Sequence, residues 1–204
     1  VGTPRFVNPL LASSDADRDI TALVFRGLMK KNPTGELVPD LAESYEVSNN
    51  GLTYTFVLKD SQFHDGTNLT AEDVLFTIKS AQDATLKSKE RVSWEGVIAK
   101  AIDEKTVTFT LRQPFAPFLE NTTLGILPKH VWEKIPYDSW IYSDANTKNA
   151  IGEGAYRVRS VSENDSGIPT MYTVAAYRTQ HGPSARIDTI RMHFYANQEA
   201  LVDG

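Results

Sequence analysis

The segment PDLAESYEVSNNGLTYTFVLKD, residues 39–60, indicates the fold class of this chain. Large apolar side chains occupy every second position from Leu52 to Leu58, which is the two-residue period of a strand with one buried face. YEVS precedes this strand, and the Asn-Asn-Gly between them is typical of a hairpin turn. The segment therefore predicts an antiparallel β-hairpin.

The next stretch, FHDGTNLTAED at residues 63–73, combines a turn with the start of a helix. Asp-Gly suits the turn. Thr70 lies where an N-cap hydroxyl can accept a backbone N–H, and Asp73 occupies the third helical position. Leu69 and Val74 have the spacing of a hydrophobic staple. We expect a helix that begins after Thr70 and continues through VLFTIKSAQD.

The same stretch contains a histidine beside a carboxylate, which raises the question of catalysis. A hydrolase that uses His64, Asp65 and a remote serine such as Ser61 or Ser93 is the alternative from the enzyme class. Nucleophilic catalysis also needs an activated hydroxyl and an oxyanion hole, and the sequence contains no G-x-S-x-G elbow. We expect a structural role for these residues, no catalytic residues, and a protein that is not an enzyme.

The rest of the chain repeats the alternation of strands and occasional helices. SSDADRDITALVFRGLMKK has helical spacing behind a cap at Ser14 with Asp17 three residues later, which predicts a helix over residues 15–30. VIAKAID and KTVTFTLRQP predict a second hairpin around residues 103–104. GAYRVRSV, PTMYTVAAY and RIDTIRMHFY read as three more strands, and residues 198–202 as the start of a helix. Many antiparallel strands with interspersed helices indicate an α+β fold.

Composition excludes several function classes. The chain has 204 residues, of which 41% are hydrophobic, enough for a sizeable core, and its net charge of −5 without a basic stripe argues against nucleic-acid binding. Cysteine is absent, and the four histidines lack the spacing of metal ligands, so we expect no metal. Gly152 and Gly154 begin a G-x-G pattern, but Arg157 replaces the third glycine, so we expect no nucleotide cofactor.

One pair of residues points to ligand binding instead. In KERVSWEG, Arg91 and Trp94 are close in sequence. The guanidinium and the indole could hold an anionic or peptidic ligand by charge and by flat apolar contact. A surface arginine beside a half-buried tryptophan explains the pair equally well. The sequence leaves both interpretations open.

The order of the motifs carries a resemblance. NPLLASSDADRDITALVFRGL, then PDLAESYEVSNNGLTYTFVLKD with FHDG and TAEDV, then FTLRQPFAPFLENTTLGILPKH, then IGEGAYRV, resembles the family 5 extracellular solute-binding proteins, the peptide- and nickel-binding components of ABC importers. The likeness covers nearly the whole chain. It implies an N-terminal fragment of a two-lobed, type II periplasmic-binding-protein-like fold, with residues 1–31 and 151–204 in a partial first lobe, residues 32–150 in an inserted subdomain, and the second lobe absent.

The resemblance also implies a function and a site. The protein would be extracytoplasmic, would capture oligopeptides by closure of two lobes and would deliver them to a membrane permease; a nickel chelate, another small anionic ligand, or peptide sensing without transport are the alternatives. An exposed sheet edge in the fragment could pair with a second copy to form a dimer. The implied ligand-binding residues are Ser13, Ser14, Asp15, Arg91, Trp94, Asn121 and Leu124.

Overall fold

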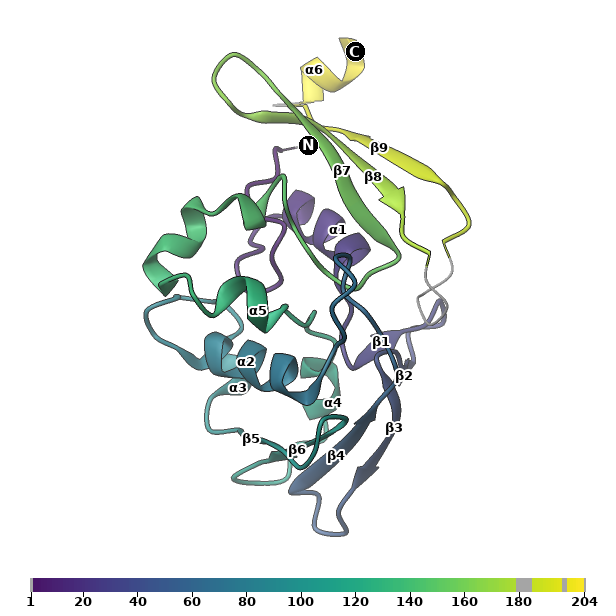
Figure 1. The fold of residues 1–204 in the computed structure, drawn as a ribbon, viewed down its shortest axis with the longest axis vertical. Helices are drawn as coiled ribbons and strands as arrows, with labels where there is room; N and C mark the ends of the chain where they lie inside the picture. Colours follow the sequence, from purple (N-terminus) through teal and green to yellow (C-terminus); the bar gives the residue numbers. More distant parts are fainter. Residues whose placement is uncertain (1, 179–184, 196–197, 204) are drawn as a thin grey trace.

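The computed structural model describes residues 2–178, 185–195 and 198–203, and its elements form two groups (Figure 1). The helices are α1 (Asp15–Val24), α2 (Ala71–Gln82), α3 (Arg91–Trp94), α4 (Phe118–Asn121), α5 (Lys129–Trp132) and α6 (Gln198–Asp203), with 3-10 turns η1 (Tyr137–Tyr142) and η2 (Asp144–Asn146). The strands are β1 (Met29–Lys31), β2 (Leu37–Pro39), β3 (Ala42–Val47), β4 (Thr53–Leu58), β5 (Ile98–Ala101), β6 (Thr106–Thr110), β7 (Tyr156–Glu163), β8 (Pro169–Ala176) and β9 (Thr189–His193).

A four-stranded antiparallel sheet in the order β3-β4-β6-β5 forms the first group, in the lower half of Figure 1. Both predicted hairpins are confirmed, since β3 pairs with β4 and β5 with β6. The alternation predicted for β4 is also confirmed: Tyr54, Phe56 and Leu58 are buried, and Val107 and Phe109 of β6 lie on the same buried face. Helix α2 packs against β5 and β6.

Helix α2 begins where the sequence predicts. Thr70 is its N-cap, and the Asp73 carboxylate accepts hydrogen bonds from the Thr70 backbone N–H (2.9 Å) and hydroxyl (3.0 Å). The other oxygen of Asp73 accepts from the Lys129 backbone N–H (2.9 Å), which ties the helix start to α5. Leu69 and Val74, the predicted staple, are fully buried. Local capping therefore also positions a neighbouring element.

Helix α1 is shorter than expected, and the prediction of a helix over residues 15–30 is wrong after Val24. The helix ends at Val24, and Phe25 is extended. The following residues pair with distant segments: the Arg26 carbonyl accepts from the Ile126 N–H, and the Leu28 carbonyl accepts from the Asp40 N–H. The apolar side chains that suggested a longer helix therefore belong to an extended segment. Long-range backbone hydrogen bonds outweigh the local helix propensity of these residues.

The second group, in the upper half of Figure 1, is the three-stranded antiparallel sheet β7-β8-β9. The three predicted strands are confirmed, and α1 packs against β7. A two-stranded ladder of β1 and β2 precedes both sheets in sequence. One hydrophobic cluster includes Val24 of α1, Phe56 of the first sheet and Tyr172 of the second. The fold is the expected α+β type, with a core shared by both groups.

Candidate ligand-binding site

His64 is a structural link and not a free base. The Gly152 N–H donates to its Nδ1 (3.2 Å), and its Nε2–H donates to the Gly154 carbonyl (3.1 Å). The Tyr177 ring packs edge-on against the imidazole, with centroids 4.8 Å apart. Burial lowers the pKa of His64 to about 4, so the ring is neutral near pH 7. Both ring nitrogens are occupied by backbone groups.

The other groups of the hydrolase hypothesis do not converge on His64. The Asp65 carboxylate bonds to His130 Nε2 (2.7 Å). Ser61 is buried and Ser93 is exposed in a different part of the fold. Without a base that faces a serine, this geometry cannot activate a nucleophile. The FHDG turn therefore has the structural role expected from the sequence: it links residues 63–66 to residues 152–154 and to His130.

The G-x-G pattern serves close packing. A Cβ on Gly152 would lie 2.1 Å from the Val24 carbonyl oxygen, and one on Gly154 would lie 2.3 Å from that of Leu23. The Gly154 N–H donates to the Val24 carbonyl (2.8 Å). Both glycines therefore let residues 152–154 lie directly against the end of α1, where no phosphate could enter.

The loop before α1 is fixed by one buried carboxylate. Asp17 accepts hydrogen bonds from the backbone N–H groups of Ser13 (2.9 Å), Ser14 (3.0 Å), Arg5 (2.6 Å) and Phe6 (3.2 Å). Burial alone would raise the pKa of Asp17, but these backbone hydrogen bonds lower it below the ordinary value. The predicted capping box is confirmed, with the Ser14 hydroxyl accepting from the Asp17 N–H.

The structure brings this loop beside the segment that precedes α3. Lys89 Nζ donates to the Ser13 carbonyl (3.3 Å), and the buried Ser88 hydroxyl donates to the Leu10 carbonyl (2.7 Å). Asp15, with 93% of its side chain exposed, pairs with Arg18. The loop before α1 therefore contacts the segment before α3, about 75 positions away in sequence.

Trp94 does not belong to that surface. Its side chain is 1% exposed and packs between Phe109 and Phe118, with ring centroids 5.5 and 5.6 Å away. The expectation that its indole projects toward a ligand is wrong. Arg91, at the other end of α3, is exposed. Apolar packing under the sheet accounts for the tryptophan, and the two side chains do not form a joint clamp.

Asn121 and Leu124 lie next to α3. Asn121 Nδ2 donates to the Ser93 carbonyl (2.8 Å), which joins α4 to α3. Leu124 is half-buried and packs against the core. Of this pair, Asn121 borders a cavity.

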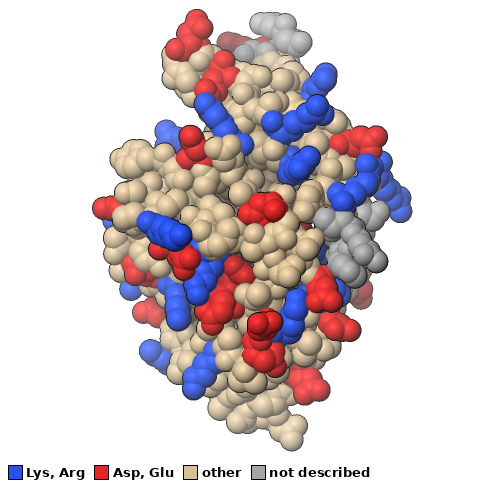
Figure 2. All heavy atoms as spheres, viewed as in Figure 1, with Lys and Arg blue, Asp and Glu red and all other residues tan. Residues whose placement is uncertain are grey.

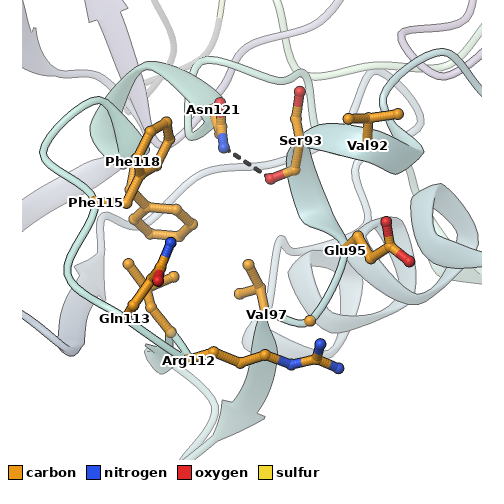
Figure 3. Close-up of a pocket in the computed structure, with 11 residues that line it drawn as sticks. Val92, Ser93, Glu95, Val97, Arg112, Gln113, Phe115, Phe118 and Asn121 are labelled. Carbon is orange, nitrogen blue, oxygen red and sulfur yellow. Dashed lines mark hydrogen bonds between the residues drawn. The ribbon is translucent and has the colours of Figure 1, made fainter.

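That cavity, of about 590 Å³, lies between α3, α4 and the loop after β6 (Figure 3). Val92 and Phe115 present apolar surface, with 81% and 48% of each residue exposed. Figure 3 shows Phe115 and Phe118 on one side and Arg112 on another, with the Asn121–Ser93 hydrogen bond at the rim. Apolar walls with a few polar groups are the usual composition of a small-ligand site.

Residues 112–118 are not among the ligand-binding residues that the sequence implies. Their part in the cavity depends on contact with α3: Gly96 lies directly against the Arg112 side chain, where a Cβ would be 2.7 Å from Nε. The exposed Phe115 in RQPFAPF was the available signal, because a large exposed aromatic side chain often marks a contact surface.

The described residues contain neither a metal-binding cluster nor a helix suited to a bilayer. Within them, no group of three or more acidic or histidine side chains could hold a metal ion. No helix in the same part of the chain has the length and apolar character of a membrane span.

Comparisons with known proteins match almost the entire chain. A family model described as bacterial extracellular solute-binding proteins, family 5 Middle, matches residues 36–203. The oligopeptide-binding protein AppA of Bacillus subtilis is 30% identical over 165 residues, which are 78% of this chain and 30% of AppA. Protein XP55 of Streptomyces lividans is 33% identical over 79% of this chain and 29% of its own length.

Solved structures agree. AppA from Bacillus subtilis in complex with a nonapeptide has a TM-score of 0.87 and 25% identity over 98% of this chain and 40% of that one. NikZ from Campylobacter jejuni in complex with Ni(L-His) has a TM-score of 0.85 and 27% identity over 99% of this chain and 39% of that one. The chain thus spans about 30% of the length of these curated relatives and about 40% of these solved chains.

Proposed function

Because the chain belongs to the family 5 bacterial extracellular solute-binding proteins, we propose that it forms part of a receptor that captures oligopeptides outside the cytoplasm for an ABC importer. The likeness to AppA in complex with a nonapeptide, over 98% of this chain, carries the proposal. Solute-binding proteins are not an enzyme family, and we propose that this chain binds its ligand without transforming it.

The proposed contact surface has two parts. In the loop at Ser13, Ser14 and Asp15, the Ser13 and Ser14 N–H groups are held by Asp17, and the exposed Asp15 carboxylate offers acceptors to the N–H groups of an extended peptide. The cavity beside Asn121 and Phe115 offers apolar surface for a peptide side chain. Arg91, which lies between these two segments in sequence, is exposed, and its guanidinium could bind a carboxylate of the peptide. Because these contacts are spread over separate segments, the arrangement favours an extended ligand over a compact one.

Closure by a second lobe is part of the proposal. A ligand held on one side only loses about half its contacts, whereas the entropic cost of association remains. A peptide that binds a two-lobed receptor at micromolar concentration should therefore bind this chain at about millimolar concentration. The membrane permease that would receive the peptide is the proposed partner.

The proposal can be tested by NMR on the isotopically labelled chain titrated with a mixture of nonapeptides. Amide shifts should concentrate at residues 13–15, 89–96 and 112–121, with half-saturation near millimolar. Phe115→Ala should weaken binding at least threefold, because it removes exposed apolar surface from the cavity. Ile141→Ala is the matched control, since Ile141 is 47% exposed and lies outside the cavity lining.

A nickel chelate is the second candidate, because the match to NikZ in complex with Ni(L-His) is equally extensive. Titration with Ni(L-His) under the same conditions separates the two. If these amide signals shift with Ni(L-His) and not with peptides, the proposed ligand is the nickel chelate and not a peptide. Shifts confined to other parts of the chain would contradict the proposed surface.

A further inference from the structure

We propose that the β7-β8-β9 sheet carries a second binding site, for a phosphate-type anion. A depression of about 760 Å³ lies on one face of this sheet, away from α3 and α4. It brings together three potentially cationic side chains and three hydroxyls: Arg159, Arg191, His193, Ser160, Thr173 and Thr189. These are the donors that a tetrahedral anion with several acceptor oxygens requires.

The strand register makes this a row across the whole sheet. Ser160 of β7 lies opposite Thr173 of β8, and Thr173 lies opposite Arg191 of β9. Neighbouring strands are about 4.8 Å apart, so the outer two are separated by about 10 Å. An arginine side chain extending from each outer strand can reach an anion above the central one.

A β-bulge adds the second arginine to this row. Consecutive residues of a regular strand point to opposite faces, so Arg159 and Ser160 should not share a surface. The register of β7 and β8 shifts between Val158 and Ser160, and both Arg159 and Ser160 line the depression. Bulges commonly re-aim a side chain beside a binding site.

The positive charge of the row is not compensated by the flanking carboxylates. Glu163 at the end of β7 pairs with Lys148 (3.0 Å), and Asp188, just before β9, pairs with Arg178 (2.5 Å). Among the ion pairs of the described residues, none includes Arg159 or Arg191. Figure 2 shows basic side chains gathered over the part of the molecule where Figure 1 places this sheet. In a chain of net charge −5, such a cluster stands out.

Thr173 at the centre of the row is a second, independent observation. It is 8% exposed and lines the depression, while Tyr172 and Val174 on either side of it are fully buried. In the strand register its hydroxyl lies between Ser160 and Arg191, as one more donor for an anion that enters the depression.

Inorganic phosphate and vesicles containing phosphatidylglycerol, each at 150 mM NaCl, are the two probes for the 204-residue chain. Calorimetry should show saturable phosphate binding that Arg159→Gln/Arg191→Gln weakens at least tenfold. Thr173→Val, which keeps every charge, should weaken it about threefold. Lys31→Gln/Lys129→Gln is the matched control: it removes two positive charges outside the depression and should stay within twofold of the wild type.

The vesicle experiment identifies the source of the phosphate group. Phosphate binding without vesicle binding assigns a free phosphate compound, whereas binding of both assigns a lipid headgroup. Binding of neither probe, or equal losses in the two double variants, would overturn the site. None of these outcomes depends on peptide binding at residues 13–15 and 112–121, so the two proposals stand or fall separately.

Discussion

At the scale of single residues, two buried ionisable groups connect residues 152–154 to the rest of the fold. His64 bonds through both ring nitrogens to the backbone of Gly152 and Gly154. Between them, Glu153 is fully buried, and its Oε1 accepts from the Arg26 N–H (2.9 Å) while its Oε2 has no partner among the described residues. Their pKa values move in opposite directions, so they predict opposite responses to pH.

The pKa of His64 is lowered from 6.5 to about 4 by burial. Between pH 6.5 and about 4, His64 is protonated in the unfolded chain but neutral in the folded chain. The stability that is present above pH 6.5 is therefore lost as the pH falls toward 4. Urea unfolding should show that the wild type loses about 2 kcal/mol more than His64→Gln between pH 7 and pH 5. His193→Gln on the exposed sheet is the control. Parallel pH profiles for wild type and His64→Gln would disprove this account.

Burial raises the pKa of Glu153 well above 4.5. This stability is fully present below pH 4.5 and is lost as the pH rises, because the unfolded chain ionises first. Glu153→Gln keeps the acceptor for Arg26 and cannot ionise, so at pH 8 it should be more stable than the wild type. At pH 4 the two should differ little. Glu46→Gln, at an exposed position in β3, is the control, and a destabilised Glu153→Gln at pH 8 would rule the explanation out.

At the scale of elements, the start of α1 determines the position of the proposed peptide-binding loop. The Asp17 carboxylate accepts four backbone hydrogen bonds that join the loop at Ser13 and Ser14 to the N-terminal segment. Capping is usually a local stabilisation of about 1 kcal/mol. Here the same carboxylate also orders a neighbouring segment, so its removal should cost more.

Asp17→Asn should lower the free energy of unfolding by about 2 to 3 kcal/mol, because an amide loses the charge and turns a donor toward N–H groups. Asp15→Asn, which alters an exposed carboxylate two residues earlier, should cost less than about 0.5 kcal/mol. Thermal or urea unfolding of both variants gives the comparison. Equal losses would mean that the buried network adds nothing to the helix cap.

At the scale of the whole molecule, segments far apart in sequence pack backbone against backbone around the end of α1. Gly152 and Gly154 contact the end of α1, and Gly27 lies against the backbone of Thr123. The division into residues 1–31 with 151–204 and residues 32–150 stays a prediction: the two sheets separate in this way, but one hydrophobic cluster includes both. Self-association of two copies through an exposed sheet edge also stays a prediction.

Gly152→Ala tests the junction. Its Cβ would lie 2.1 Å from the Val24 carbonyl oxygen, so residues 152–154 and α1 must separate, and we expect a loss of about 3 kcal/mol or more. Gly35→Ala is the comparison, because Gly35 has a positive φ of 85° and open space around it, and left-handed strain alone costs about 1 to 2 kcal/mol. Unfolding measurements that rank Gly35→Ala as the worse variant would contradict the packing explanation.

The sequence by itself determined the features whose causes lie within a few residues. The two-residue period of β4, the Asn-Asn-Gly turn and the capping signals at Ser14 and Thr70 predicted elements that the structure contains. The order of these motifs also indicated the family. Hydrophobic periodicity and capping act through neighbours in the chain, so they can be read from the sequence.

Only the tertiary structure decided features that depend on distant contacts. Trp94 lies in the core because Phe109 and Phe118 surround it, and α1 ends at Val24 because residues 25–28 pair with strands and loops far along the chain. The cavity beside Phe115 and the row across β7, β8 and β9 exist only once separate segments meet. Sequence spacing does not specify which face of an element its neighbours will cover, and packing energy settles that choice.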